Sequence, residues 1–264
     1  MAPERCQRPL SPFSREKRGL GATNSRMPRP PRIVIPGLPH HITQRGNYRQ
    51  QVFYRDADRE IYLRLLADYS RHCGVSLEAY CLMENHVHLV AVPHAADSLA
   101  RLMQRLNSEY ARWIHFHRNK MGHLWQARFH SVALDREHFW ATMVYVEQNP
   151  SRAGLVELPW QWRWSSARAH VGEEKRGFLD LLRWRAAHSP ETWKCCLELG
   201  IREAALQDRI RQATLSGWPL GGEEFCRRLE TELGVQARPR SPRKPPTPEI
   251  SSMTSNTSGK ASAS

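Results

Sequence analysis

The stretch VSLEAYCLMENHVHLVAV, residues 75–92, decides the fold of this chain. The polar pair Glu84-Asn85 interrupts an otherwise apolar run, and this pattern predicts a β-hairpin with strands at 75–83 and 86–92. Side chains alternate between the two faces of a strand. His86 and His88 are therefore expected to point to the same face of the sheet.

Strand and helix patterns flank the hairpin on both sides. In chain order we expect a strand at 41–45, a helix capped by Asp56 or Asp58 and ended by Gly74, the hairpin, a helix capped by Asp97 or Ser98, a strand at 124–134 and a helix at 136–148. This order is that of the ferredoxin-like, split β-α-β plan of the α+β class, in which helices cover one face of an antiparallel sheet. The other face is then expected to be free to hold a site.

The rest of the chain divides into three segments. Residues 1–26 lack apolar periodicity and are predicted to be a disordered basic segment, with Met27 opening the ordered pattern. Residues 151–235 are predicted to be a helical extension, either a DNA-binding addition or a stabilising cap, that packs on the core through Trp160, Trp162 and Trp164. Residues 236–264 are predicted to be a second disordered basic tail.

Composition narrows the class of partner. The chain has 264 residues and a formal net charge of +13, and Arg supplies 33 of its 39 basic residues. Because Arg binds phosphate through bidentate hydrogen bonds, this charge favours nucleic acid as a partner. We expect no membrane span, because no stretch approaches about 18 apolar residues. The absence of an apolar leader and of a C-x-x-C pair among the six cysteines predicts a cytoplasmic protein with reduced thiols.

His86 and His88 are candidate metal ligands, because two neutral imidazoles side by side are a common ligand pair for first-row metals. The alternative is a solvated strand face. A second His-x-His motif, at His115 and His117, falls near the end of a predicted helix, where a spacing of two residues turns side chains about 200° apart. That second pair is not expected to hold one ion.

Tyr145 and Asn149 are four residues apart on a predicted helix, so they share a face. Taken singly, Tyr145 could be a core residue and Asn149 a helix C-cap. With the histidine pair they fit one reaction, in which the phenol attacks a backbone phosphate and forms a covalent phosphotyrosine. A free Tyr has a pKa of about 10, so a divalent ion held by the imidazoles and the amide would offset the developing charge. Because the bond energy is kept as an ester, the step can be reversed to rejoin DNA.

Five segments, in order and spacing, resemble the single-tyrosine HUH transposases of the insertion-sequence 200-like family, and within them the REP-associated tyrosine transposases. The resemblance covers roughly residues 28–170. The segments are HITQRGN at 41–47, MENHVHLV at 83–90, GHLWQARF at 122–129, YVEQNPSRAGLV at 145–156 and WSS at 164–166.

The resemblance implies that His86 and His88 hold Mg²⁺ or Mn²⁺, with Asn149 as third ligand and Tyr145 as nucleophile. Residues 27–150 would then be a catalytic domain that nicks and rejoins hairpin-containing single-stranded DNA through a 5′-phosphotyrosine. The implied partner is single-stranded DNA with hairpin or palindromic repeats, the implied location is the cytoplasm at the nucleoid, and a homodimer is left open. Candidates for phosphate contacts are Arg45, Arg49, Arg128 and Arg152.

Three residues bear on this assignment. Glu84 stands where the family often has Pro in the turn before the histidines, and Gln148 is a second amide beside Asn149. Tyr110 lies on another helix without an amide four residues later, so we expect it in the core. Two other functions stay open: a non-catalytic module that binds single-stranded nucleic acid on its sheet, and a metal-dependent hydrolase that uses water.

Overall fold

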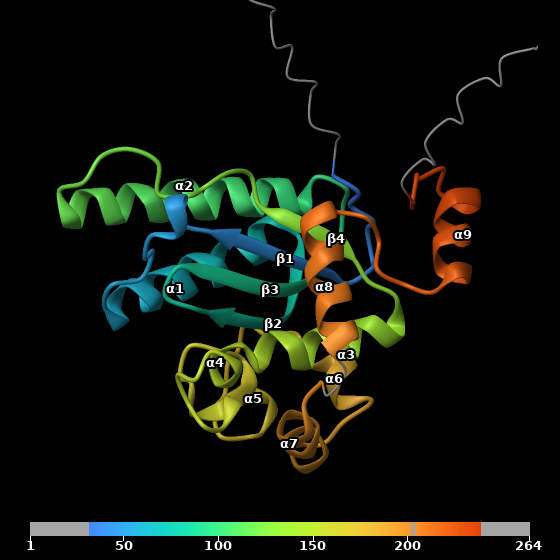
Figure 1. The fold of residues 1–264 in the computed structure, drawn as a ribbon. Coiled ribbons are helices and arrows are strands. Elements are labelled where there is room, and N and C mark those ends of the chain that lie inside the picture. Colours follow the sequence, from blue (N-terminus) through green and yellow to red (C-terminus); the bar gives the residue numbers. More distant parts are fainter. Residues whose placement is uncertain (1–31, 202–203, 239–264) are drawn as a thin grey trace, which may run out of the picture. The chain divides into compact units, whose positions relative to one another are not determined.

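A four-stranded antiparallel sheet organises the residues that the computed structural model describes, 32–201 and 204–238 (Figure 1). Its strands, in the order β2-β3-β1-β4, are β2 (Val75–Leu82), β3 (His86–Pro93), β1 (His40–Arg45) and β4 (His130–Ala133). Both β1 and β2 run antiparallel to β3, so they point in the same direction with β3 between them. This is the split β-α-β topology, and the predicted ferredoxin-like α+β fold is confirmed.

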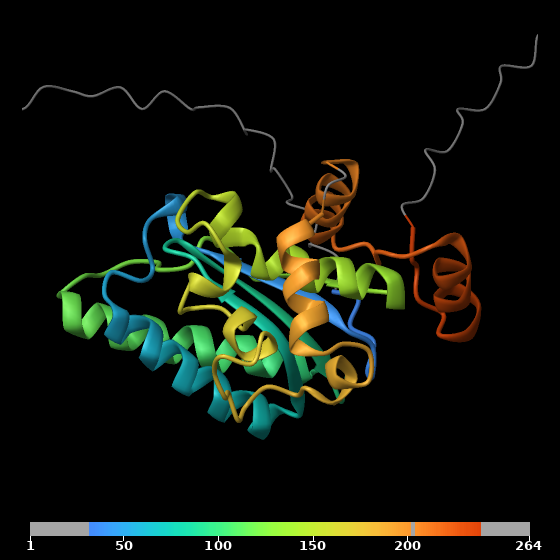
Figure 2. The ribbon, with the colours of Figure 1, turned by 90° about the horizontal axis from the view of Figure 1, so that it is seen from below.

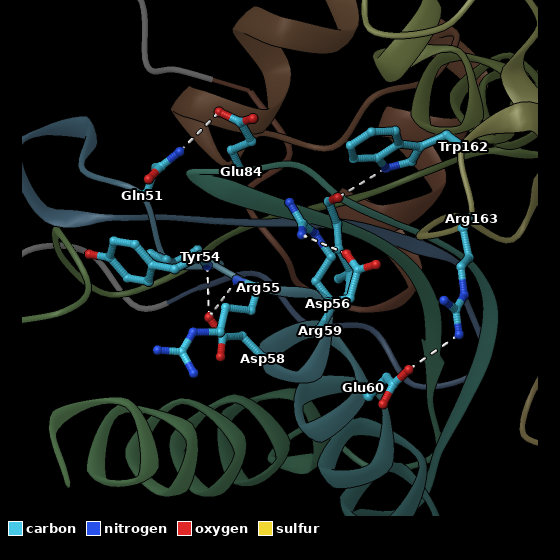
Figure 3. Close-up of polar contacts among 12 residues, drawn as sticks. Gln51, Tyr54, Arg55, Asp56, Asp58, Arg59, Glu60, Glu84, Trp162 and Arg163 are labelled. Atoms are coloured by element: carbon cyan, nitrogen blue, oxygen red, sulfur yellow. Dashed lines mark hydrogen bonds and ion pairs between the residues drawn. The ribbon is translucent and has the colours of Figure 1, made fainter. Parts of the chain in front are cut away.

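The hairpin of β2 and β3 forms where the sequence predicts it. Its turn is held by the backbone carbonyl of Glu84, which accepts hydrogen bonds from the backbone N–H groups of Val52 and Phe53 at 2.8 and 3.1 Å. The Glu84 side chain accepts a further bond from the amide of Gln51 at 3.3 Å (Figure 3). Because the anchor is a carbonyl, which Pro also has, Glu replaces Pro here without loss of the anchor.

Helices α1 (Asp56–Cys73) and α2 (Ser98–Arg118) cover one face of the sheet. The carboxylate of Asp58 caps α1 by accepting from the backbone N–H groups of Tyr54 and Arg55 at 2.7 and 3.0 Å (Figure 3). Gly74 ends α1 in the left-handed conformation, at φ 65°.

Tyr110 lies in the core between these helices and the sheet, as predicted. Its side chain is fully buried, and its hydroxyl donates to the backbone carbonyl of Val52 at 2.6 Å. Burial raises the pKa of Tyr110 above its ordinary value. A phenol held in this way is a packing residue and not a nucleophile.

The other face of the sheet is covered as well, by α3 (Arg136–Glu147) and α8 (Ala204–Ser216) (Figures 1 and 2). The expectation that this face is free is therefore wrong. The physical reason is that the histidines share the face with apolar side chains, among them Val90 and Val132, which need cover. Only the histidine end of this face is left for chemistry.

β4 is shorter than predicted, because only 130–133 of the expected 124–134 form a strand. Leu124 and Trp125 instead contact the loop that contains the 3-10 turn η1 (Asn47–Arg49) after β1. The backbone N–H of Asn47 donates to the Leu124 carbonyl at 2.8 Å, and Gly46 bridges to Trp125.

The extension after α3 is helical, as predicted, and its tryptophans bind it to the core. Trp160 and Trp164 are buried, and the indole N–H of Trp162 donates to the backbone carbonyl of Leu82 at 3.1 Å (Figure 3). Its elements are α4 (Asn149–Arg152), η2 (Pro159–Gln161), α5 (Ala167–His170), α6 (Leu182–Arg185), α7 (Pro190–Leu199), α8 and α9 (Glu223–Glu232). The predicted disordered segment 1–26 lies outside the described residues, as does the predicted tail 236–264 except for 236–238, where Ala237 is buried. Within the described residues, no helix has the length and apolarity that a membrane span needs.

Candidate active site

Three histidines meet on the sheet face that α3 and α8 cover. The register of β1 and β3 pairs Arg45 with His86 and Thr43 with His88, so these side chains share a face with His41, two residues before Thr43. The rings of His86 and His88 have centroids 5.0 Å apart. The rings of His41 and His88 are nearly parallel, at 8°, with centroids 5.1 Å apart. The prediction that His86 and His88 lie together on one face is confirmed.

Helix α3 brings Tyr145 against this histidine cluster. The Tyr145 ring lies edge-on to His41 and His88, with a centroid distance of 6.0 Å to each. The residue is 5% exposed and packs among the apolar side chains under α3, so it is also part of the core. Its hydroxyl makes no hydrogen bond to any residue that the structure describes.

Arg152 and Asn149 lie beside Tyr145 on the following turns. The guanidinium carbon of Arg152 is 4.1 Å from the centroid of the Tyr145 ring, and Nη1 donates to the Tyr145 carbonyl at 2.9 Å. The Asn149 amide donates to the carbonyls of Tyr145 and Val146, each at 3.1 Å, while its Oδ1 accepts from Nη2 of Arg152 at 2.9 Å. Asn149 thus caps the end of α3, and its oxygen would have to leave Arg152 to bind a metal.

Gln148, the other amide, is turned away from Tyr145. Its Nε2 donates to the backbone carbonyl of Leu197 at 2.7 Å, at the end of α7. Gly200 gives this side chain its space, because a Cβ at that position would lie 2.2 Å from Nε2 of Gln148. The bond to Leu197 favours Asn149 over Gln148 as the amide of the site.

The imidazoles of the cluster are kept neutral. Burial, and then the charge of Arg45, lowers the pKa of His86 to about 4. Burial, and then the charge of Arg152, lowers the pKa of His41 to about 3, and burial together with its charged and imidazole neighbours lowers the pKa of His88 well below its ordinary value. Neutral imidazoles are the form that binds a metal.

The free ring nitrogens fit a metal. Nδ1 of His86 is 2.6 Å from Oδ1 of Asn85, and Nδ2 of Asn85 donates to the Arg49 carbonyl, so Oδ1 is the acceptor. The proton of His86 is therefore on Nδ1, which leaves a lone pair on Nε2. Nε2 of His86 and of His88 has no hydrogen-bond partner among the described residues.

A metal here would need oxygen ligands too. Across 32–201 and 204–238, no group of three His, Cys, Asp or Glu side chains is arranged to hold an ion. The two imidazoles would therefore be completed by an amide oxygen or by the phosphate of a substrate. His115 and His117 take no part, since Nδ1 of His117 donates to the Trp113 carbonyl at 2.9 Å on the helix surface.

Basic side chains surround the cluster unevenly. Arg45 lies opposite His86, and Arg49 is close enough that, after burial, it lowers the pKa of Arg45. Arg152 covers the Tyr145 ring. Arg128, the fourth predicted phosphate contact, instead lies near Arg32, whose pKa burial and then Arg128 lower. The structure brings three of the four predicted arginines to the site.

His41 is the site residue that sequence reasoning missed. It lies on a strand that the sequence predicts, and the two-residue repeat from Arg45 through Thr43 places it on the histidine face. That alternation is the signal that could have identified it. Nδ1 of His41 also lies 2.8 Å from the hydroxyl of Thr214, for which the sequence carries no signal.

With this geometry in place, residues 35–149 match the model of a family described as IS200-like transposases. This segment therefore resembles an IS200-like transposase domain. The matched residues include His41, His86, His88 and Tyr145, and they end at Asn149.

A search of curated proteins finds no match to the chain. Two solved structures resemble part of this chain. One is a REP-associated tyrosine transposase bound to a REP hairpin, with 18% identity over 58% of this chain and 94% of that chain and a TM-score of 0.47. The other, from Deinococcus radiodurans R1, is described as a transposase, with 21% identity over 42% of this chain and 89% of that chain and a TM-score of 0.29. At these identities and TM-scores, neither structure assigns an activity to this chain.

Proposed function

We propose that this chain is an IS200-like transposase that nicks and rejoins hairpin-containing single-stranded DNA through a covalent bond between Tyr145 and a 5′-phosphate. One Mg²⁺ or Mn²⁺ ion would be held by His86 and His88 and completed by Asn149. The observation that carries the proposal is the 6.0 Å separation of the Tyr145 and His88 rings within one chain. A phenol and an imidazole at this separation can meet the same phosphate group.

The reaction balances without an added energy source. The Tyr145 oxygen attacks the phosphorus, the bond from phosphorus to the 3′ oxygen breaks, and a phosphotyrosine ester replaces the phosphodiester. The phenol loses its proton to water, and the departing 3′ oxygen takes up a proton to become a hydroxyl. The reverse of these steps rejoins the strand. A bound divalent ion would supply a positive charge that stabilises the phosphate oxygens as charge builds on them.

The residues around Tyr145 support the attack in distinct ways. Arg152 bonds to the backbone of Tyr145 and lies over its ring, which limits the orientations of the phenol. Arg45, opposite His86, adds a cation where the phosphate would lie. The neutral imidazoles present lone pairs and do not compete with the arginines for the phosphate.

The substrate class rests on the resemblance in the motifs and on the surface beside the site. Tyr48, in the turn that follows β1, is 93% exposed and stands next to Arg49. An exposed aromatic ring beside a cation is suited to stacking an unpaired base while the cation binds the backbone. These features favour single-stranded DNA near the foot of a hairpin.

The test uses end-labelled single-stranded hairpin DNA, Mn²⁺ and the full chain. On a denaturing gel we expect a protein–DNA species that is lost in Tyr145→Phe and kept in Tyr48→Phe, a matched change on the surface. His86→Ala and His88→Ala are each expected to abolish cleavage while DNA binding is largely retained. A free 5′-phosphate without the adduct would instead indicate a hydrolase that uses water, and binding without cleavage would indicate a non-catalytic module.

A further inference from the structure

A chain of hydrogen bonds links the C-terminal extension to the histidine pair. Thr214, on α8, is 4% exposed, and its hydroxyl lies 2.8 Å from Nδ1 of His41. Nε2 of His41 lies 2.9 Å from Nδ1 of His88. Both bonds are buried, and Thr214 is 173 residues from His41 in the sequence. Helix α8 passes along β1 and β4, which brings Thr214 to this place (Figures 1 and 2).

The direction of each hydrogen bond follows from which atoms carry a proton. A threonine hydroxyl has one proton, and that of Thr214 is donated to the Ile210 carbonyl at 2.6 Å. Toward His41 the hydroxyl oxygen can then only accept, so Nδ1 of His41 carries the proton. A neutral imidazole has one N–H, so Nε2 of His41 is an acceptor. Nδ1 of His88 must therefore be the donor, which leaves the lone pair of His88 on Nε2.

We propose that Thr214 is a positioning residue that acts through His41 to keep Nε2 of His88 unprotonated and oriented to bind a divalent cation. This rests on the proposed function of His88 as a metal ligand. It also gives the extension a role in the reaction, because a helix outside the matched family segment determines which ring nitrogens carry the protons in His41, on β1, and His88, on β3. A histidine ligand commonly has its other ring nitrogen bound in this way, and the bond sets both tautomer and ring orientation.

If both hydrogen bonds ran in the opposite direction, Nε2 of His88 could not bind a metal ion. If the Thr214 hydroxyl donated to His41, Nε2 of His41 would donate to His88, and Nε2 of His88 would carry a proton. Thr214→Val keeps the shape of the side chain but removes the oxygen that accepts from His41. His88 can then carry its proton on either Nδ1 or Nε2. Thr214→Ser keeps the hydroxyl. Thr142→Val is the matched control, because the hydroxyl of Thr142 is buried and has no hydrogen-bond partner among the described residues.

The tautomers are read first, without metal, from the ¹⁵N shifts of the histidine rings in the full chain. We expect His88 with a proton on Nδ1 only, retained in Thr214→Ser and Thr142→Val and mixed in Thr214→Val. A wild-type His88 with its proton on Nε2 would overturn the inference, and this result needs no variant to fold.

Mn²⁺ binding, followed by calorimetry, is the second readout. Thr214→Val is expected to weaken binding by about 10- to 100-fold, whereas Thr214→Ser and Thr142→Val should bind like the wild type. Equal affinity in folded Thr214→Val would also overturn the inference. If His88→Ala bound Mn²⁺ as the wild type does, the metal site of the proposed function would be wrong instead. The tautomer measurement would still test the chain of hydrogen bonds from Thr214 to His88.

Discussion

The guanidinium of Arg152 lies over the ring of Tyr145, with its central carbon 4.1 Å from the ring centroid, and it also donates to the Tyr145 carbonyl at 2.9 Å. One side chain thus contacts both the ring and the backbone of the proposed nucleophile. It also donates to Oδ1 of Asn149, the proposed third metal ligand. Arg152 therefore couples the position of the phenol to that of the amide.

Removing this contact should slow the chemistry more than it weakens DNA binding. We expect Arg152→Ala to lower the rate of adduct formation by about 100-fold, the scale for a reacting group that is held about 1 Å out of place. Arg152→Lys should be intermediate, because Lys keeps the charge but not the planar, bidentate group. Arg163→Ala, which breaks an exposed ion pair with Glu60, is the control and should leave the rate unchanged. An adduct formed by Arg152→Ala at the wild-type rate would contradict this role.

The two neighbouring amides give a second prediction. Asn149→Ala should weaken Mn²⁺ binding, because it removes the proposed oxygen ligand. Gln148→Ala should leave Mn²⁺ binding unchanged and lower the free energy of unfolding by about 1 kcal/mol, the usual value for one lost hydrogen bond, here the bond to Leu197. Calorimetric titration and urea unfolding separate the two effects, and weaker metal binding only in Gln148→Ala would reverse the assignment.

The sequence pattern predicted the elements whose form depends on residues that are close together in the sequence. The hairpin followed from two apolar runs and a polar turn, and α1 ends, as predicted, at Gly74, which adopts the left-handed conformation. β4 was predicted too long because Leu124 and Trp125 bond to the loop after β1, a contact between distant segments that periodicity does not encode.

In the candidate site, too, spacing within a segment could be used for prediction, whereas contacts between distant segments could not. His86, His88 and Tyr145 could be named from spacing, and the structure brings them together. The interaction of Thr214 with His41 could not be predicted, because 173 residues separate them and a lone threonine in a helix has no distinguishing pattern. The cover over the second sheet face was missed because an alternating strand predicts which side chains share a face but not what packs on it.

The helix of Tyr145 depends on a buried carboxylate two residues further on. Glu147 is fully buried, and its oxygens accept from the hydroxyl of Ser166, from Nδ1 of His170 at 2.5 Å and from the indole of Trp193 at 2.8 Å. These partners come from α7 and from α5 and the residue before it, so one side chain joins the extension to α3.

Loss of this carboxylate should destabilise the chain strongly. Glu147→Ala leaves buried donors without an acceptor and is expected to lower the free energy of unfolding by about 3 to 5 kcal/mol. Glu137→Ala, on the exposed side of the same helix, should change it by about 0.5 kcal/mol or less. Urea unfolding measures both, and equal effects would show that the buried network adds nothing.

Stability should also fall in mild acid. His40 is fully buried, donates from Nδ1 to the Leu38 carbonyl and accepts at Nε2 from the N–H of Ile35, so it is held neutral. Burial lowers its pKa from 6.5 to about 4. Between these two pKa values the unfolded chain therefore binds more protons than the folded chain. The contribution of His40 to the stability of the fold is present above pH 6.5 and lost as the pH falls toward 4.

The size of this effect is about 1.4 kcal/mol for each unit of pKa difference. Urea midpoints measured from neutral pH down to the lower end of this range should fall steadily. The fall should be shallower in His40→Gln, which has no proton to gain at this position. A wild-type midpoint that did not change with pH would contradict the neutral, buried assignment of His40.

The most direct test of the central claim is to locate the DNA adduct by mass spectrometry. After reaction with hairpin DNA, nuclease digestion and trypsin, the peptide from Glu137 to Arg152 contains a single tyrosine. We predict that the residual 5′-nucleotide is on Tyr145 in this peptide. An adduct on any other residue, or cleavage with no modified peptide, would contradict the account.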